Sequence, residues 1–272
     1  MTRGGFIQST VVGFTRAFAR ALMSEEIARQ RGLLQSLDPR VRVVGLFALV
    51  LSVTLSRRLA VVLVLFVAAV MIAIFSRVSI GTLAKRVWLV VLAFTGVIAL
   101  PAIFITPGNP IATFAGGSLR ITAPGVATAV LLIARVETAV TFTTLLILCT
   151  PWTHVLKALR SFHLPHEVIA MLAMTHRYIF LLVETANQMF ESRQSRTVGR
   201  LRGAEQRRMT ARIAGVLLSK SIALGNDVYL AMQSRGFRGE VRILSDFRMK
   251  SWDYVGLLAF LCVGGIAVWI GR

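Results

Sequence analysis

The chain has 272 residues, 56% of them hydrophobic, and it carries 31 Lys and Arg residues against 12 Asp and Glu residues. This hydrophobic share exceeds the roughly 45–50% of soluble domains and excludes an ordinary soluble globule. A membrane protein usually keeps an excess of positive charge, here a formal +19, on its cytoplasmic side. We therefore expect an integral membrane protein with a basic cytoplasmic part.

Five apolar stretches reach or approach the ~20 residues that a helix needs to cross a bilayer core. They cover residues 41–56, 59–76, 87–106, 126–149 and 252–270. The predicted fold class is all-α: a polytopic membrane bundle of about five transmembrane helices with a cytoplasmic three-helix module. Only Ser56, Arg57 and Arg58 separate the first two stretches, which predicts a tight helical hairpin.

Lys and Arg residues between the spans predict the orientation, because they are retained in the cytoplasm during insertion. They are frequent before the first span and after the second, whereas the loop 107–125 holds only Arg120. The N-terminus is therefore predicted inside and this loop outside. Arg57 and Arg58 count against this orientation, although long side chains near a short helix end can reach the interface.

The pattern divides the chain into four parts. We predict an N-terminal cytoplasmic or interfacial segment, four spans, a cytoplasmic coupling segment and a C-terminal span at residues 1–36, 37–150, 151–251 and 252–272. The first part has apolar residues at helical spacing, which fits either a helix in the headgroup plane or a disordered basic tail.

Three helices are predicted in the segment 151–251, which carries more than half of the cationic residues. Thr150-Pro151 offers an N-cap and a first-turn proline for a short helix that ends near Phe162. Pro165 begins a second helix that extends to about Thr197. A third is expected from about Arg207 to Arg235, with Gly236 as a left-handed C-cap.

The two long helices end in similar tripeptides, Ser195-Arg196-Thr197 and Ser234-Arg235-Gly236. The helix macrodipole favours an arginine in the last turn, and the chain break after it leaves the guanidinium able to reach carboxylates or carbonyls of a partner. A rigid helix with such an end can transmit a push. The bland alternative is that arginine is simply common near helix C-termini.

Four passages resemble the transmembrane T component of energy-coupling factor transporters, most closely its cobalt-type, CbiQ-like branch. The passages are Leu37-Asp38-Pro39-Arg40, His154-Val155-Leu156-Lys157-Ala158-Leu159, Thr175-His176-Arg177-Tyr178-Ile179-Phe180 and Ala231-Met232-Gln233-Ser234-Arg235-Gly236-Phe237. They keep the family's order over nearly the whole chain from about Leu37.

The resemblance implies a multi-pass, non-enzymatic subunit in the plasma membrane of a prokaryote. It would link a membrane-embedded substrate-binding subunit to two cytoplasmic ATP-binding-cassette ATPases, for uptake of cobalt or nickel. In that family, two Ala-Arg-Gly-like motifs insert into grooves of the ATPases. Ser195-Arg196-Thr197 and Ser234-Arg235-Gly236 would be these motifs, both with Ser for Ala and the first with Thr197 for the glycine.

Other chemical motifs are scarce. Cys149 and Cys262 lie inside apolar runs, where we expect core or lipid-facing thiols. The sequence has no G-x-x-x-x-G-K-[ST] loop, so ATP hydrolysis must come from another chain. The arginines also lack the interleaved aromatics that nucleic-acid binders use. We expect no enzymatic activity, no cofactor and no nucleic-acid partner.

Histidines and two buried charges raise alternatives. His163 and His166 could hold a metal, but Pro165 interrupts their spacing and no acidic or cysteine cluster completes a coordination shell. Arg135 and Glu137 lie inside the fourth span, where charges are costly. We interpret them as satisfied within the bundle rather than as transport residues. The rival functions are an intramembrane enzyme and a self-contained carrier, and a carrier would place its polar residues at mid-membrane.

Overall fold

The computed structural model describes residues 32–106, 110–114, 119–162, 164–196, 203–237 and 251–272. The chain divides into two compact units. The bundle unit comprises residues 24–158 and 246–272, and the two-helix unit comprises residues 1–23 and 159–245. The predicted N-terminal segment lies outside the described residues up to position 31.

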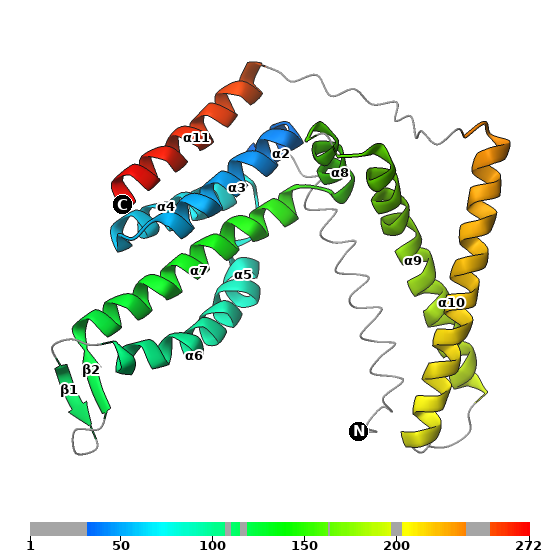
Figure 1. The fold of residues 1–272 in the computed structure, drawn as a ribbon, viewed down its shortest axis with the longest axis horizontal. Helices are drawn as coiled ribbons and strands as arrows, with labels where there is room; N and C mark the ends of the chain where they lie inside the picture. The colour runs from blue at the N-terminus through cyan, green and yellow to red at the C-terminus, as the bar shows by residue number, and fades with distance from the viewer. Residues whose placement is uncertain (1–31, 107–109, 115–118, 163, 197–202, 238–250) are drawn as a thin grey trace. The chain divides into compact units, whose positions relative to one another are not determined.

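The bundle unit is built from helices (Figure 1). Its helical elements are α2 (Leu33–Ser36), α3 (Pro39–Leu55), α4 (Leu59–Phe75), α5 (Ile80–Leu83), the π-helical turn η1 (Ala84–Trp88), α6 (Leu89–Ile105), α7 (Ala123–Cys149), most of α8 (Trp152–Ser161) and α11 (Ser251–Gly271). The prediction of an all-α membrane bundle is confirmed.

The five predicted spans correspond to α3, α4, α6, α7 and α11. One boundary was wrong: the helix expected to begin at residue 87 begins at Ile80 and continues through η1 into α6. Lys85 and Arg86 therefore lie in a helix rather than in a loop. Trp88 explains part of this, because its indole N–H donates to Thr141 Oγ1 of α7 at 3.1 Å and so fixes η1 against the bundle.

The loop predicted at 107–125 contains a small antiparallel hairpin of β1 (Pro110–Phe114) and β2 (Leu119–Thr122), with an irregularity near Pro110. Helix α7 follows directly. Its N-cap is Thr122, whose hydroxyl accepts the Gly125 N–H at 3.2 Å. Capping by Thr and a proline in the first turn explain why the helix begins here.

The core of the bundle unit lies where α7 packs against α3 and α4, and α11 packs along α3. Its fully buried side chains include Leu49 and Val53 of α3, Leu65 of α4, and Phe142 and Leu145 of α7. Glycines allow the close approach of α3 and α11. A Cβ on Gly264 would lie 2.8 Å from Ser52 Oγ, and one on Gly45 would lie 2.5 Å from the Phe260 ring.

The two-helix unit contains α9 (His166–Ser195) and α10 (Gly203–Ser234). Both agree with the predicted helices, although α10 begins at Gly203 rather than near Arg207. They contact each other through Phe190 and Ile213, with three partly buried apolar neighbours around this pair. Figure 1 shows α10 crossing α9 near the end of α9.

Helix length and composition identify four possible membrane spans in the described part of the chain. They are Ala123–Cys149, Glu167–Arg193, Gly203–Ser234 and Ser251–Gly271. Helices α4 and α6 are shorter apolar helices. The two long helices assigned to the cytoplasm from their charge thus also have spanning length.

Candidate functional site

Helix α9 ends at the first tripeptide. Ser195 is its last helical residue, and its hydroxyl donates to the Ser192 carbonyl at 3.0 Å. The Arg196 N–H donates to the Arg193 carbonyl at 3.2 Å, which closes the last turn. Ser195 and Arg196 are both exposed. Thr197, the third residue of this predicted motif, lies outside the described residues.

Helix α10 ends at the second tripeptide with the same local geometry. The Ser234 hydroxyl donates to the Ala231 carbonyl at 2.9 Å, and the Arg235 N–H donates to the Met232 carbonyl at 3.1 Å. Gly236 follows with a φ of +83°, which glycine adopts without steric cost. Both Ser234 and Arg235 are exposed.

A Schellman motif stops α10 directly after Arg235. The Gly236 N–H donates to the Gln233 carbonyl at 2.9 Å, and the Phe237 N–H donates to the Met232 carbonyl at 3.0 Å. The predicted left-handed C-cap is therefore confirmed. In both tripeptides the serine hydroxyl turns back onto its own helix.

Further arginines surround the first tripeptide, and we did not predict this grouping. A hollow of about 340 Å³ lies between the end of α9 and the start of α10. It is lined by Arg193, Arg196, Glu205, Arg208, Met209, Arg212 and Ile213. The sequence carried a signal for it, because Arg193 and Arg196, like Arg208 and Arg212, are spaced to share one face of a helix.

The two charges within α7 have different surroundings. Arg135 donates through Nη2 to the carbonyl oxygen of Ser56, in the turn between α3 and α4, at 2.7 Å. This contact satisfies Nη2, whereas the buried Nε of Arg135 has no hydrogen-bond partner within the described residues, so the interpretation that this side chain is satisfied holds only in part. Glu137 is buried, and neither carboxylate oxygen has a hydrogen-bond partner within the described residues.

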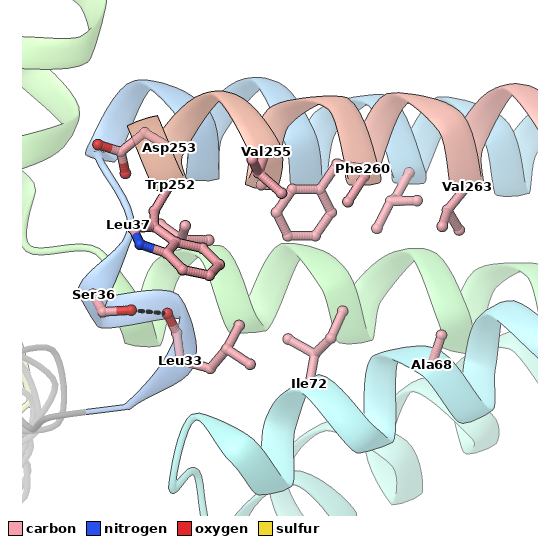
Figure 2. Close-up of a pocket in the computed structure, with 13 residues that line it drawn as sticks. Leu33, Ser36, Leu37, Ala68, Ile72, Trp252, Asp253, Val255, Phe260 and Val263 are labelled. Atoms are coloured by element: carbon pink, nitrogen blue, oxygen red, sulfur yellow. Dashed lines mark hydrogen bonds between the residues drawn. The ribbon is translucent and has the colours of Figure 1, made fainter. Parts of the chain in front are cut away.

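An apolar groove of about 630 Å³ lies among α2, α3, α4 and α11 of the bundle unit. Figure 2 shows Leu33 and Ile72 on one side of it and Trp252 and Phe260 on the other. The carboxylate of Asp253 points away from the groove (Figure 2). A surface of this kind is suited to apolar chains rather than to an ion.

Metal ligands are not grouped in the part of the chain that the structure describes: no three His, Cys, Asp or Glu residues there could hold an ion together. His163 lies outside that part. Of the cysteines, Cys149 is buried and Cys262 is exposed, and both are free thiols.

Comparison with known proteins identifies the family. The chain matches the CbiQ family, described as cobalt transport protein, over residues 30–243. It therefore belongs to this family of transporter membrane components. Together with its apolar helices, the match makes it a multi-pass membrane protein.

Individual relatives agree with this assignment. An uncharacterised protein of Methanocaldococcus jannaschii is 30% identical over 91% of this chain and 86% of its own length. The energy-coupling factor transporter transmembrane protein EcfT of Leuconostoc gelidum is 28% identical over 66% of this chain and 69% of its own length. The cobalt transport protein CbiQ of Rhodobacter capsulatus is 27% identical over 62% of this chain and 69% of its own length.

Proposed function

We propose that this chain is the coupling subunit of an energy-coupling factor importer. It receives the ATP-driven motion of two cytoplasmic ATPases through α9 and α10 and passes it to a membrane-embedded substrate-binding subunit. The chain itself is not an enzyme. The names of two relatives support the assignment to this class of transporter. The C-terminal ends of α9 and α10 support coupling through Arg196 and Arg235.

The observation that carries this proposal is the repeated geometry of the two helix ends. Arg196 and Arg235 each follow a serine that is bonded to its own helix, each closes a last turn, and each is exposed. A guanidinium held at the end of a helix of about thirty residues can insert its planar fork between carboxylates or carbonyls of a partner.

The hollow at the end of α9 supports an acidic partner surface at the first contact. Four arginines and one glutamate line it, so its local charge is strongly positive. Such a surface attracts carboxylates and repels basic surfaces. We infer that the ATPase groove that receives Arg196 is acidic.

Cobalt is the proposed substrate of the assembled importer, with nickel as the alternative. The family description and the Rhodobacter capsulatus relative both name cobalt transport. Uptake of radioactive cobalt and of radioactive nickel by cells that express the complete transporter distinguishes the two ions. A transporter that carries neither would overturn this part of the proposal.

Copurification tests the coupling role. The tagged full chain is purified from membranes as wild type, Arg196→Glu, Arg235→Glu and the double variant. We expect ATPases to copurify with the wild type, in smaller amounts with each single variant, and almost not at all with the double variant. The reason is that reversed charges repel an acidic groove. Lys220→Glu is the control. Lys220 is exposed in the middle of α10, and its replacement by Glu changes the net charge by as much as each single arginine variant does.

Two results contradict the proposal. One is full ATPase recovery with the double variant. The other is an equal loss with Lys220→Glu, which would mean that net charge rather than the helix ends holds the ATPases.

A further inference from the structure

The chain crosses between the two units three times, and two of these crossings lie on either side of the segment that holds α9 and α10. The chain leaves through α8, which follows Cys149 at the end of α7, and it returns into α11, whose first turn holds Asp253. Motion of α9 and α10 can reach the bundle along these two covalent connections. Both are bound to the same short segment, here termed the anchor turn (residues 34–42), which comprises the end of α2, the turn after it and the first residues of α3.

Arg42 binds the outgoing connection. Arg42 is only 4% exposed. Nη1 donates to the carbonyl oxygen of Cys149, the last residue of α7, at 2.8 Å. The same side chain donates from Nε to the Leu37 carbonyl at 2.9 Å and from Nη2 to the Gln35 carbonyl at 2.8 Å. One rigid fork thus ties the end of α7 to the anchor turn, where the helix dipole favours a cation.

Asp253 binds the returning connection. Its Oδ1 accepts the backbone N–H of Asp38 at 2.7 Å, and its side chain is 5% exposed. Asp38 is itself the N-cap of α3, because its Oδ1 accepts the Arg40 N–H at 2.9 Å. The carboxylates of Asp38 and Asp253 also attract the charge of Arg42.

The anchor turn also contacts α4. Gln35 Nε2 donates to the carbonyl oxygen of Ser76 at 3.1 Å, and the Leu34 N–H donates to Ser76 Oγ at 3.4 Å. Ser76 is fully buried at the C-cap of α4. The ends of α4 and α7 and the starts of α3 and α11 therefore meet at one turn.

We propose that the anchor turn is the positioning element of the coupling mechanism, with Arg42 and Asp253 as its two clamps. The inference rests on the proposed function. Bonds to charged, buried groups are costly to leave unmade, so a shift at either connection must carry the turn with it. Motions that arrive through α8 and through α11 are then combined before they reach α3 and α4.

Hydrogen exchange of the full chain in lipid nanodiscs tests the clamps. We expect Arg42→Met to raise exchange at the start of α8, and Asp253→Ala to raise exchange at Asp38 and the first turn of α11. Each rise should be about tenfold or more, the change expected for the loss of one charged hydrogen bond. Asp253→Asn keeps an oxygen that accepts the Asp38 N–H but loses the charge, and its exchange should rise less than that of Asp253→Ala.

Trp88→Phe is the matched control, because it removes another hydrogen bond of the bundle unit, the 3.1 Å contact with Thr141. It should leave exchange at both connections unchanged. If Arg42→Met does not fold, the pair of Asp253→Ala and Asp253→Asn decides the result. Only the asparagine variant keeps a side-chain oxygen that can accept the Asp38 N–H. Equal exchange in this pair, or an equal rise with Trp88→Phe, overturns the inference.

Transport separates a positioning role from a purely structural one. The clamp variants retain Arg196 and Arg235 and should still copurify ATPases. Cobalt or nickel taken up per ATP hydrolysed should fall about tenfold with Asp253→Ala and recover in part with Asp253→Asn. Unchanged uptake per ATP overturns the inference. If the wild-type chain binds no ATPases, the proposed function fails, and the exchange experiment still decides whether the clamps exist.

Discussion

Arg77 has a backbone conformation that its residue type disfavours. It follows α4 with a φ of 56°. Its N–H donates to the Ile74 carbonyl at 3.0 Å and the Val78 N–H donates to the Ala73 carbonyl at 3.0 Å, which is the Schellman arrangement that usually contains glycine. A side chain in this region costs energy that glycine avoids.

Replacing Arg77 by glycine should therefore stabilise the bundle by about 1 kcal/mol. The melting temperature of the purified protein in detergent measures this. Arg77→Ala is the control, because it removes the same charge but keeps a Cβ. A gain with alanine equal to that with glycine would show that charge rather than backbone conformation is responsible.

The tripeptides make a second prediction at single residues. Ser195→Ala and Ser234→Ala should leave ATPase copurification unchanged, because these hydroxyls bond only to their own helices in the contacts seen here. Arg235→Lys should weaken it by about 1–3 kcal/mol, since an ammonium cannot replace a charged bidentate fork. Titration of the ATPases against each variant measures the difference. Full affinity of the lysine variant would argue that charge alone makes the contact.

Among the helices, the close approach of α6 and α7 makes a third prediction. A Cβ on Gly125 would lie 2.7 Å and 2.9 Å from the carbonyl oxygens of Ile103 and Ala102 in α6, and backbone atoms cannot turn aside. Gly125→Ala should destabilise the protein by about 1–3 kcal/mol. Gly96→Ala, which meets nothing within 4 Å, should be neutral or stabilising by up to about 1 kcal/mol.

Thermal unfolding of both variants measures this contrast. Equal melting temperatures for Gly125→Ala and Gly96→Ala would contradict the observed packing of α6 against α7.

The sequence predicted elements well where local chemistry decides them. Pro165 and Gly236 predicted the start of α9 and the end of α10, because prolines and caps act within a turn of the chain. The N-cap expected at Thr150 was wrong, because its buried hydroxyl has no hydrogen-bond partner within the described residues and α8 begins at Trp152. The early start at Ile80 was missed, since the contact of Trp88 with Thr141 that fixes η1 joins residues far apart in sequence. The hairpin in the loop 107–125 was missed as well.

The candidate site was predictable in part for the same reason. The two arginines at helix ends are visible as local patterns, whereas the hollow of four arginines forms only when α9 and α10 meet. Arg42 appeared in the sequence as one more cation before the first span. Its contact with Cys149 depends on how the whole bundle packs.

For the whole molecule, we infer that the two units have different roles in coupling. The two-helix unit carries exposed arginines at the ends of α9 and α10. In the bundle unit, the end of α7 before α8 and the first turn of α11 both bond to the anchor turn. In our account the first unit meets the ATPases and the second moves as a consequence. The central claim is that Arg196 and Arg235 are the points of contact.

Site-specific cross-linking tests that claim most directly. In a Cys262→Ser background, which leaves only the buried Cys149, single cysteines are placed by Ser195→Cys, Ser234→Cys and Lys220→Cys. Each is labelled with a maleimide that carries a benzophenone, and the assembled complex is irradiated so that the benzophenone inserts into nearby C–H bonds of any partner. The account predicts cross-links to an ATPase from positions 195 and 234 and none from position 220. Absence of ATPase cross-links from both helix ends, or equal cross-linking from position 220, would contradict it.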